Sequence, residues 1–193
     1  MTTTPHSAAL AYFATPGPLT DLSAHAARVR DLPDAPADLC RVVQGLVVHP
    51  FLAHLYGLEP TALRHDELEI RAAAAMLDRM LALDSRPLDE PRPPERRFVG
   101  NCRHFTVLLC ALLRARGVPA RARCGFGAYF DPPRFEDHWV CEVWDEARGS
   151  PTAPRATVPN APIVPAVTSA CRITPTKPRG ELVSLRDGVV NAL

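Results

Sequence analysis

The chain has 193 residues, with 22 Lys and Arg against 21 Asp and Glu, and its formal net charge at pH 7 is +1. This length is sufficient for one domain with a buried core, and the balanced charge excludes the electrostatic field that gathers nucleic acids or anionic membranes. The chain start lacks a signal-peptide pattern, and the apolar stretches are too short or too interrupted to span a bilayer. We therefore expect a cytoplasmic protein without nucleic-acid or membrane partners.

The N-terminal part of the chain, residues 1–90, is expected to be mainly helical. Residues 1–19 are rich in Thr, Pro and Ala and predict an extended lead-in. Apolar spacing predicts a short helix that ends near residue 30, and further helices over about residues 34–47, 51–56 and 66–83. In the last of these, Glu67 and Glu69 are expected to lie largely outside the apolar stripe.

A proline-rich segment separates this part from the next. Residues 87–94 contain four prolines, which predicts an extended segment that crosses the surface.

The second part, residues 91–149, has the clearest pattern of elements. Gly100-Asn101 is typical of a loop and helix cap, which places Cys102 in the first turn of an apolar helix. Gly117 suits the left-handed position at the end of that helix, and Pro119 prevents its continuation. Residues 120–130 and 136–145 then predict two strands, joined by a turn at 131–133.

Cys102 and His138 are the candidate catalytic residues. A helix N-terminus and a nearby imidazolium lower the pKa of a thiol, and unpaired N–H groups in the first turn can hold an oxyanion. His138 begins the second strand, where the mixed side chains on its face do not settle which way it points. A thiol and a base are the pair that acyl transfer through a thioester requires.

Three segments together resemble the transglutaminase-like superfamily. They are Gly-x-Cys-x-x-Phe at 100–105, Arg-x-x-Gly-x-Pro-Ala-Arg at 114–121 and His-x-Val-x-Glu-x-Trp at 138–144. The resemblance implies a papain-like α+β fold, in which N-terminal helices and a core helix pack on a small antiparallel sheet. It also implies that Cys102 is the nucleophile and His138 its base, that glutamine side chains or peptide-like amides are the substrates, and that no cofactor is needed. The helical lead-in is similar to that of bacterial members.

The sequence departs from the superfamily pattern at two places. The second residue after the nucleophile is often acidic in bacterial members, but here it is His104. The acid that orients the histidine should follow His138 by sixteen or seventeen residues, where this chain has Pro154 and Arg155, and residues 148–180 contain no acid. Asp145 follows His138 by only seven residues, which is too close in the sequence for this acid.

The last part of the chain, residues 150–193, has seven prolines and no aromatic residue. This composition predicts a disordered or out-of-frame tail. We therefore expect the chain to be a truncated or frameshifted form of a longer protein after about residue 149, with an open sheet edge after Trp144.

Several alternatives accompany this interpretation. A zinc site from Cys102, His104, His138 and Cys141 is disfavoured, because within each pair the side chains point in opposite directions; no metal is expected. The six cysteines (40, 102, 110, 124, 141 and 171) are expected to be free thiols, and the other histidines (6, 25, 49, 54 and 65) to be isolated surface or helix-end residues.

The sequence leaves two functional classes open. The first is a cysteine acyltransferase or amidohydrolase acting through a Cys102 thioester. The second is a catalytically defective remnant or a non-enzymatic binding scaffold that lacks the triad acid.

Overall fold

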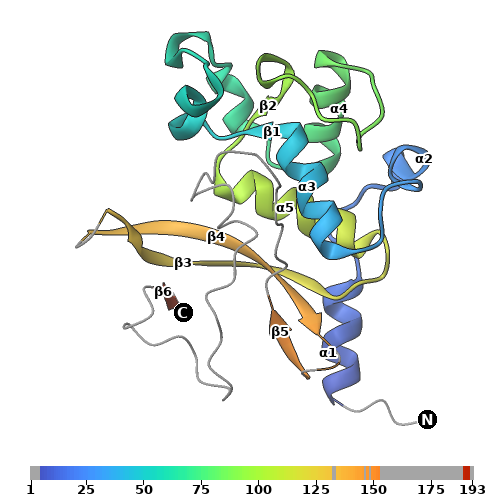
Figure 1. Ribbon diagram of the computed structural model, residues 1–193. Coiled ribbons are helices and arrows are strands. Elements are labelled where there is room, and N and C mark those ends of the chain that lie inside the picture. The colour runs from blue at the N-terminus through green and yellow to red at the C-terminus, as the bar shows by residue number, and fades with distance from the viewer. Residues whose placement is uncertain (1–4, 132–133, 146, 148, 153–188, 192–193) are drawn as a thin grey trace.

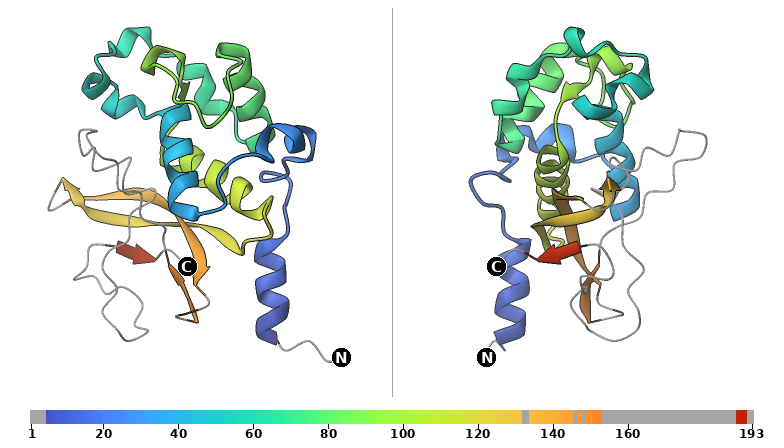
Figure 2. Two further views of the ribbon diagram at one scale, coloured as in Figure 1. Left: turned by 45° about the vertical axis from the view of Figure 1, so that its right-hand side comes forward. Right: turned by 90° about the vertical axis from the view of Figure 1, so that its left-hand side faces the viewer.

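The computed structural model describes residues 5–131, 134–145, 147, 149–152 and 189–191. The fold is α+β, as expected: helix α5 lies between a group of helices on one side and an antiparallel sheet on the other (Figure 1). Figure 2 shows the same order of layers from two further directions.

The helices are α1 (Pro5–Ala14), α2 (Ala26–Val29), α3 (Pro36–Leu46), α4 (Ala73–Leu83) and α5 (Cys102–Arg114). Short 3-10 helices lie between them: η1 (Ser23–His25), η2 (Pro50–Tyr56), η3 (Pro60–Ala62), η4 (His65–Glu69) and η5 (Pro94–Arg96). The strands are β1 (Val47–Val48), β2 (Phe98–Val99), β3 (Ala120–Asp131), β4 (Arg134–Asp145), β5 (Ser150–Thr152) and β6 (Val189–Asn191).

The N-terminal lead-in is partly helical, so the prediction of an extended segment over residues 1–19 was wrong for α1. Pro5 suits the first position of a helix, and the run of Ala and Leu that follows has high helix propensity. The helix projects away from the helical group and lies near β3 (Figure 2). The guanidinium of Arg121 in β3 lies 5.9 Å from the centre of the Phe13 ring.

The helix expected over residues 66–83 is broken into η4 and α4, and Glu67 is fully buried rather than outside the apolar face. Its Oε1 accepts hydrogen bonds from Nε of Arg64 and Nε of Arg79, each at 2.7 Å. Its Oε2 accepts one from the backbone N–H of Val99, also at 2.7 Å. The break after η4 allows a buried carboxylate to pair with two guanidinium groups, and this long-range pairing leaves no trace in the helical periodicity.

The proline-rich segment folds around a buried arginine, which corrects the expectation of a simple extended surface crossing. Arg92 is only 1% exposed. Prolines supply carbonyl groups but no N–H donors, and the guanidinium of Arg92 provides donors for the local carbonyls. Those acceptors are the carbonyl oxygens of Asp84, Arg86, Pro87 and Glu90, at 2.8–3.3 Å.

Helix α5 is the centre of the core. Most of its side chains are buried, because α3 and α4 cover one side and β3 and β4 the other. On the sheet side, Sγ of Cys110 lies 3.3 Å from Sγ of Cys141 in β4. The helix ends as predicted, with Gly117 at a φ of +70°.

The sheet has the order β5-β4-β3-β6, and all neighbouring strands are antiparallel. β3 and β4 match the predicted strands closely. β5 pairs with residues 143–145 of β4, so the expectation of an open edge after Trp144 was wrong. A separate parallel pair joins β1 to β2 and places the end of β1 beside the chain that enters α5.

Of the expected disordered tail, residues 150–152 and 189–191 form β5 and β6, and residues 153–188 lie outside the described residues. The expectation of an out-of-frame tail therefore concerns mainly residues that the structure does not describe. In the part of the chain that is described, no helix has the length and apolar character to cross a membrane.

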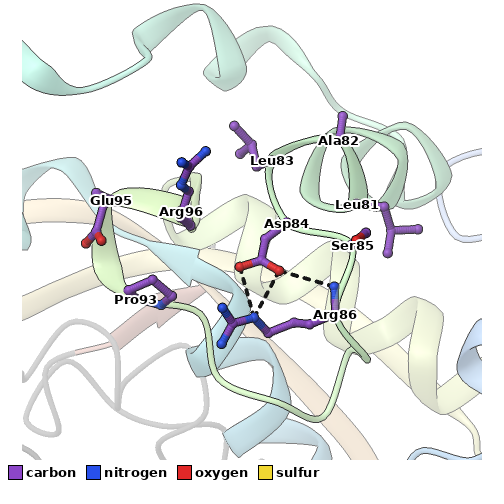
Figure 3. A pocket seen from close by; sticks show the side chains of 9 residues that line it. All are labelled: Leu81, Ala82, Leu83, Asp84, Ser85, Arg86, Pro93, Glu95 and Arg96. Carbon is purple, nitrogen blue, oxygen red and sulfur yellow. Dashed lines mark hydrogen bonds and ion pairs between the residues drawn. The ribbon is translucent and has the colours of Figure 1, made fainter.

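A polar pocket of about 510 Å³ lies where the end of α4 faces η5 (Figure 3). Oδ1 of Asp84 accepts hydrogen bonds from the backbone N–H and Nε of Arg86, at 3.1 and 2.9 Å. The pocket is open to solvent, and neither Cys102 nor His138 lines it. This pocket is therefore separate from Cys102 at the start of α5.

Candidate active site

Cys102 is the first residue of α5, as the sequence predicted, and a capping box fixes this helix end. Asn101 is the N-cap, and its Oδ1 accepts a hydrogen bond from the backbone N–H of Arg103 at 3.2 Å. In return, Nδ1 of His104 accepts one from the backbone N–H of Asn101 at 3.1 Å.

These bonds explain why His104 can stand where related sequences often have an acid. It occupies the third helical position, where a Glu side chain commonly closes a capping box. Here the fully buried imidazole of His104 performs this structural task. Burial is the main cause that lowers its pKa, followed by the charge of Arg103, and both favour the neutral ring.

The residue before the cap, Gly100, lies in a space that excludes a side chain. A Cβ at this position would lie 2.8 Å from Cβ of His104 and 2.9 Å from Cγ1 of Val47. The backbone N–H of Gly100 also donates to the carbonyl of Val48 at 3.0 Å, which joins β1 to the start of α5.

We expect Gly100→Ala to lower the free energy of unfolding by about 1–3 kcal/mol, because the added methyl group overpacks a buried contact. Urea unfolding measures the change. Gly17→Ala is the matched control, since a Cβ there has no atom within 4 Å, and it should leave stability unchanged or slightly raised. Equal effects of the two substitutions would contradict the close approach at Gly100.

The thiol of Cys102 faces the sheet at β4. Burial raises its pKa, and the negative charge of Asp137 adds to this, while the backbone N–H groups of Trp139 and Arg103 oppose it. The expectation that the helix N-terminus would give a low thiol pKa was therefore wrong, because desolvation outweighs the N–H groups. The resting thiol is protonated near neutral pH, and attack requires a base.

We expect Asp137→Asn to lower the pKa of the Cys102 thiol, because it removes a negative charge that disfavours the thiolate. At a fixed neutral pH the rate of alkylation by iodoacetamide should rise, and the rate–pH curve should move to lower pH. Glu136→Gln is the control, because Glu136 is the adjacent acidic residue of β4, is equally exposed, and by strand alternation points to the opposite face from Asp137. Identical curves for Asp137→Asn and the wild type would contradict this account.

His138 lies in β4 between the two residues that act on the thiol, and it is 6% exposed. Its partner across the ladder is Gly125 of β3, whereas Trp139 lies opposite Cys124. His138 also lies near His49, which belongs to the helical part of the chain. Cys102, His138 and His49 are thus grouped around the start of α5.

His49 is a residue of this region that the sequence interpretation missed. The expectation that His49 is isolated was wrong, because His138 and His104 lie near it. The expectation that it lies at a helix end is confirmed. It is the N-cap of η2, where its Nδ1 accepts a hydrogen bond from the backbone N–H of Phe51 at 3.3 Å. Burial, followed by the nearby His138 and His104, lowers its pKa from 6.5 to about 4. A histidine directly after an apolar run and before Pro50 was the only signal in the sequence.

Within the described ranges, no three His, Cys, Asp or Glu side chains are arranged to hold a metal ion. Cys40, Cys102, Cys110, Cys124 and Cys141 are thiols that form no disulfide, and Cys171 lies outside those ranges. Positions 154 and 155, where the orienting acid was sought, also lie outside them.

Residues 68–150 match the family model of the transglutaminase-like superfamily. This segment contains α4, α5, β3 and β4, and with them both Cys102 and His138. The resemblance stated from the three sequence motifs is therefore confirmed for this segment of the chain. No curated protein and no solved structure matches the chain.

Proposed function

We propose that the protein is a cysteine acyltransferase or amidohydrolase that acts on glutamine side chains or peptide-like amides. The observation that carries this proposal is the position of Cys102, at the capped start of α5 and against the part of β4 that carries His138, within the segment that matches the superfamily.

In the proposed reaction, His138 accepts the proton of the Cys102 thiol as the sulfur attacks the amide carbon. The carbonyl electrons move to the oxygen, which the N–H groups of the first turn of α5 stabilise. The intermediate then collapses, its C–N bond breaks, and His138 returns the proton to the departing amine or ammonia. Water or an amine finally releases the acyl group from the thioester.

The test uses the full chain with a glutamine-containing peptide, in the presence and absence of a fluorescent primary amine. Mass spectrometry should find the peptide acyl group on Cys102, and then either hydrolysed peptide or the amine conjugate. Cys102→Ser should give none of these products, whereas Cys124→Ser, which changes another half-buried thiol nearby, should retain them. Products that persist in Cys102→Ser would overturn the proposal.

A non-enzymatic scaffold is the second candidate, and the raised pKa of the Cys102 thiol favours it. A binding scaffold needs no activated thiol. It predicts that iodoacetamide labels Cys102 no faster than an ordinary thiol at any pH and that no acyl adduct accumulates.

A further inference from the structure

The position of His49 brings a third imidazole to the start of α5. β1 pairs in parallel with β2, and Val48 accepts the N–H of Gly100, so His49 follows directly from the residue joined to the entry of α5. His49 is 6% exposed and has His138 and His104 as neighbours. It therefore lies on the helical side of the same site whose sheet side carries His138.

The hydrogen bond at Nδ1 determines which nitrogen of His49 carries the proton. The backbone N–H of Phe51 is a donor, so Nδ1 must be the acceptor. In a neutral imidazole the proton then resides on Nε2. The low pKa of His49 keeps the ring neutral at physiological pH. His49 consequently presents a fixed Nε2–H donor, and it cannot accept a proton without breaking its cap.

We propose that His49 is a catalytic residue whose Nε2–H donates a hydrogen bond to the carbonyl oxygen of the amide substrate, beside the N–H groups at the start of α5. This inference rests on the proposed function. As the Cys102 sulfur adds to the carbonyl carbon, the C=O electrons move to the oxygen, and the donor stabilises that negative charge without transferring its proton. The proton that leaves the thiol goes to His138.

Two substitutions separate this role from capping. Asn places an oxygen near the position of Nδ1 and is a preferred N-cap, so His49→Asn keeps the bond to Phe51 and removes the distal donor. Gln reaches further and places an amide N–H near the position of Nε2, so His49→Gln keeps the donor. His54→Asn is the control, because His54 is an exposed histidine of the same 3-10 helix.

Each variant is assayed for acylation of Cys102 by p-nitrophenyl acetate and for alkylation by iodoacetamide. Only acylation develops an oxyanion, because alkylation is a substitution at a saturated carbon. We expect His49→Asn to slow acylation by about 10²–10³-fold, the usual loss for one oxyanion donor, and to leave alkylation within about twofold. His49→Gln should recover much of the acylation rate, and His54→Asn should match the wild type in both reactions.

The outcomes that overturn the inference are distinct. Unchanged acylation in His49→Asn would exclude the donor role, and equal losses in both reactions would show a structural role instead. If His49→Asn does not fold, an acylation rate in His49→Gln as low as in a His49→Phe variant would also exclude it. Failure of the wild type to acylate Cys102 would overturn the proposed function, and this inference with it.

Discussion

Replacing Glu67 by Ala is expected to lower the free energy of unfolding by about 3 kcal/mol, at the low end of what breaking a buried ion pair costs. The substitution leaves two guanidinium groups without their carboxylate and the N–H of Val99 without its acceptor. The side chains of Arg64 and Arg79 are 27% and 35% exposed, so water partly compensates them, which places the effect at this end of the range. Urea unfolding monitored by circular dichroism measures it.

The effect should extend to the candidate site, because Val99 is three residues before Cys102. Hydrogen exchange should therefore show faster exchange of the N–H groups of Val99 and Gly100 in Glu67→Ala. Glu69→Gln is the control: Glu69 is two residues further on, 80% exposed, and 3.5 Å from Arg71. An exposed pair of this kind contributes about 0–1 kcal/mol. If the two substitutions destabilise the protein equally, the buried network does not hold the entry of α5.

The elements around the nucleophile could be predicted because their signals are local. Asn101 caps α5, Gly117 ends it, and the alternation in residues 120–145 specifies β3 and β4. Each of these signals involves residues only a few positions apart, and the structure has each element within a few residues of its predicted bounds.

The elements that were missed depend on contacts between distant residues. Glu67 is an acidic residue in an apolar helical pattern, and only its contacts with Arg79 and Val99 make it a core residue. β5 is three residues long, too short for an alternating pattern, and exists because β4 offers it a free edge. No window of sequence contains this information.

The candidate site also combines local features, which could be predicted, with contacts between distant residues, which could not. The cap that makes Cys102 the first helical residue is local, so this residue could be placed correctly. The thiol pKa was predicted in the wrong direction, since burial against β4 and the charge of Asp137 come from a segment about 35 residues away. His49 was missed because its proximity to His138 results from the pairing of β1 with β2.

Replacing His138 by Ala is expected to slow acylation of Cys102 at neutral pH by about 10²–10⁴-fold, the usual contribution of a positioned general base. The physical reason is the raised pKa of the thiol, which leaves the sulfur protonated at rest and in need of a proton acceptor during attack. Stopped-flow acylation by p-nitrophenyl acetate across a range of pH measures this.

The pH dependence of the loss in acylation rate distinguishes a general base from a residue that only shapes the site. As the pH rises toward and above the pKa of the thiol, solvent removes the proton without help, so the rates of His138→Ala and the wild type should converge. His65→Ala, at an exposed histidine of η4, is the control and should follow the wild type throughout. A deficit of the same size at every pH would mean that His138 only shapes the site, and no deficit at neutral pH would remove it from the proposed mechanism.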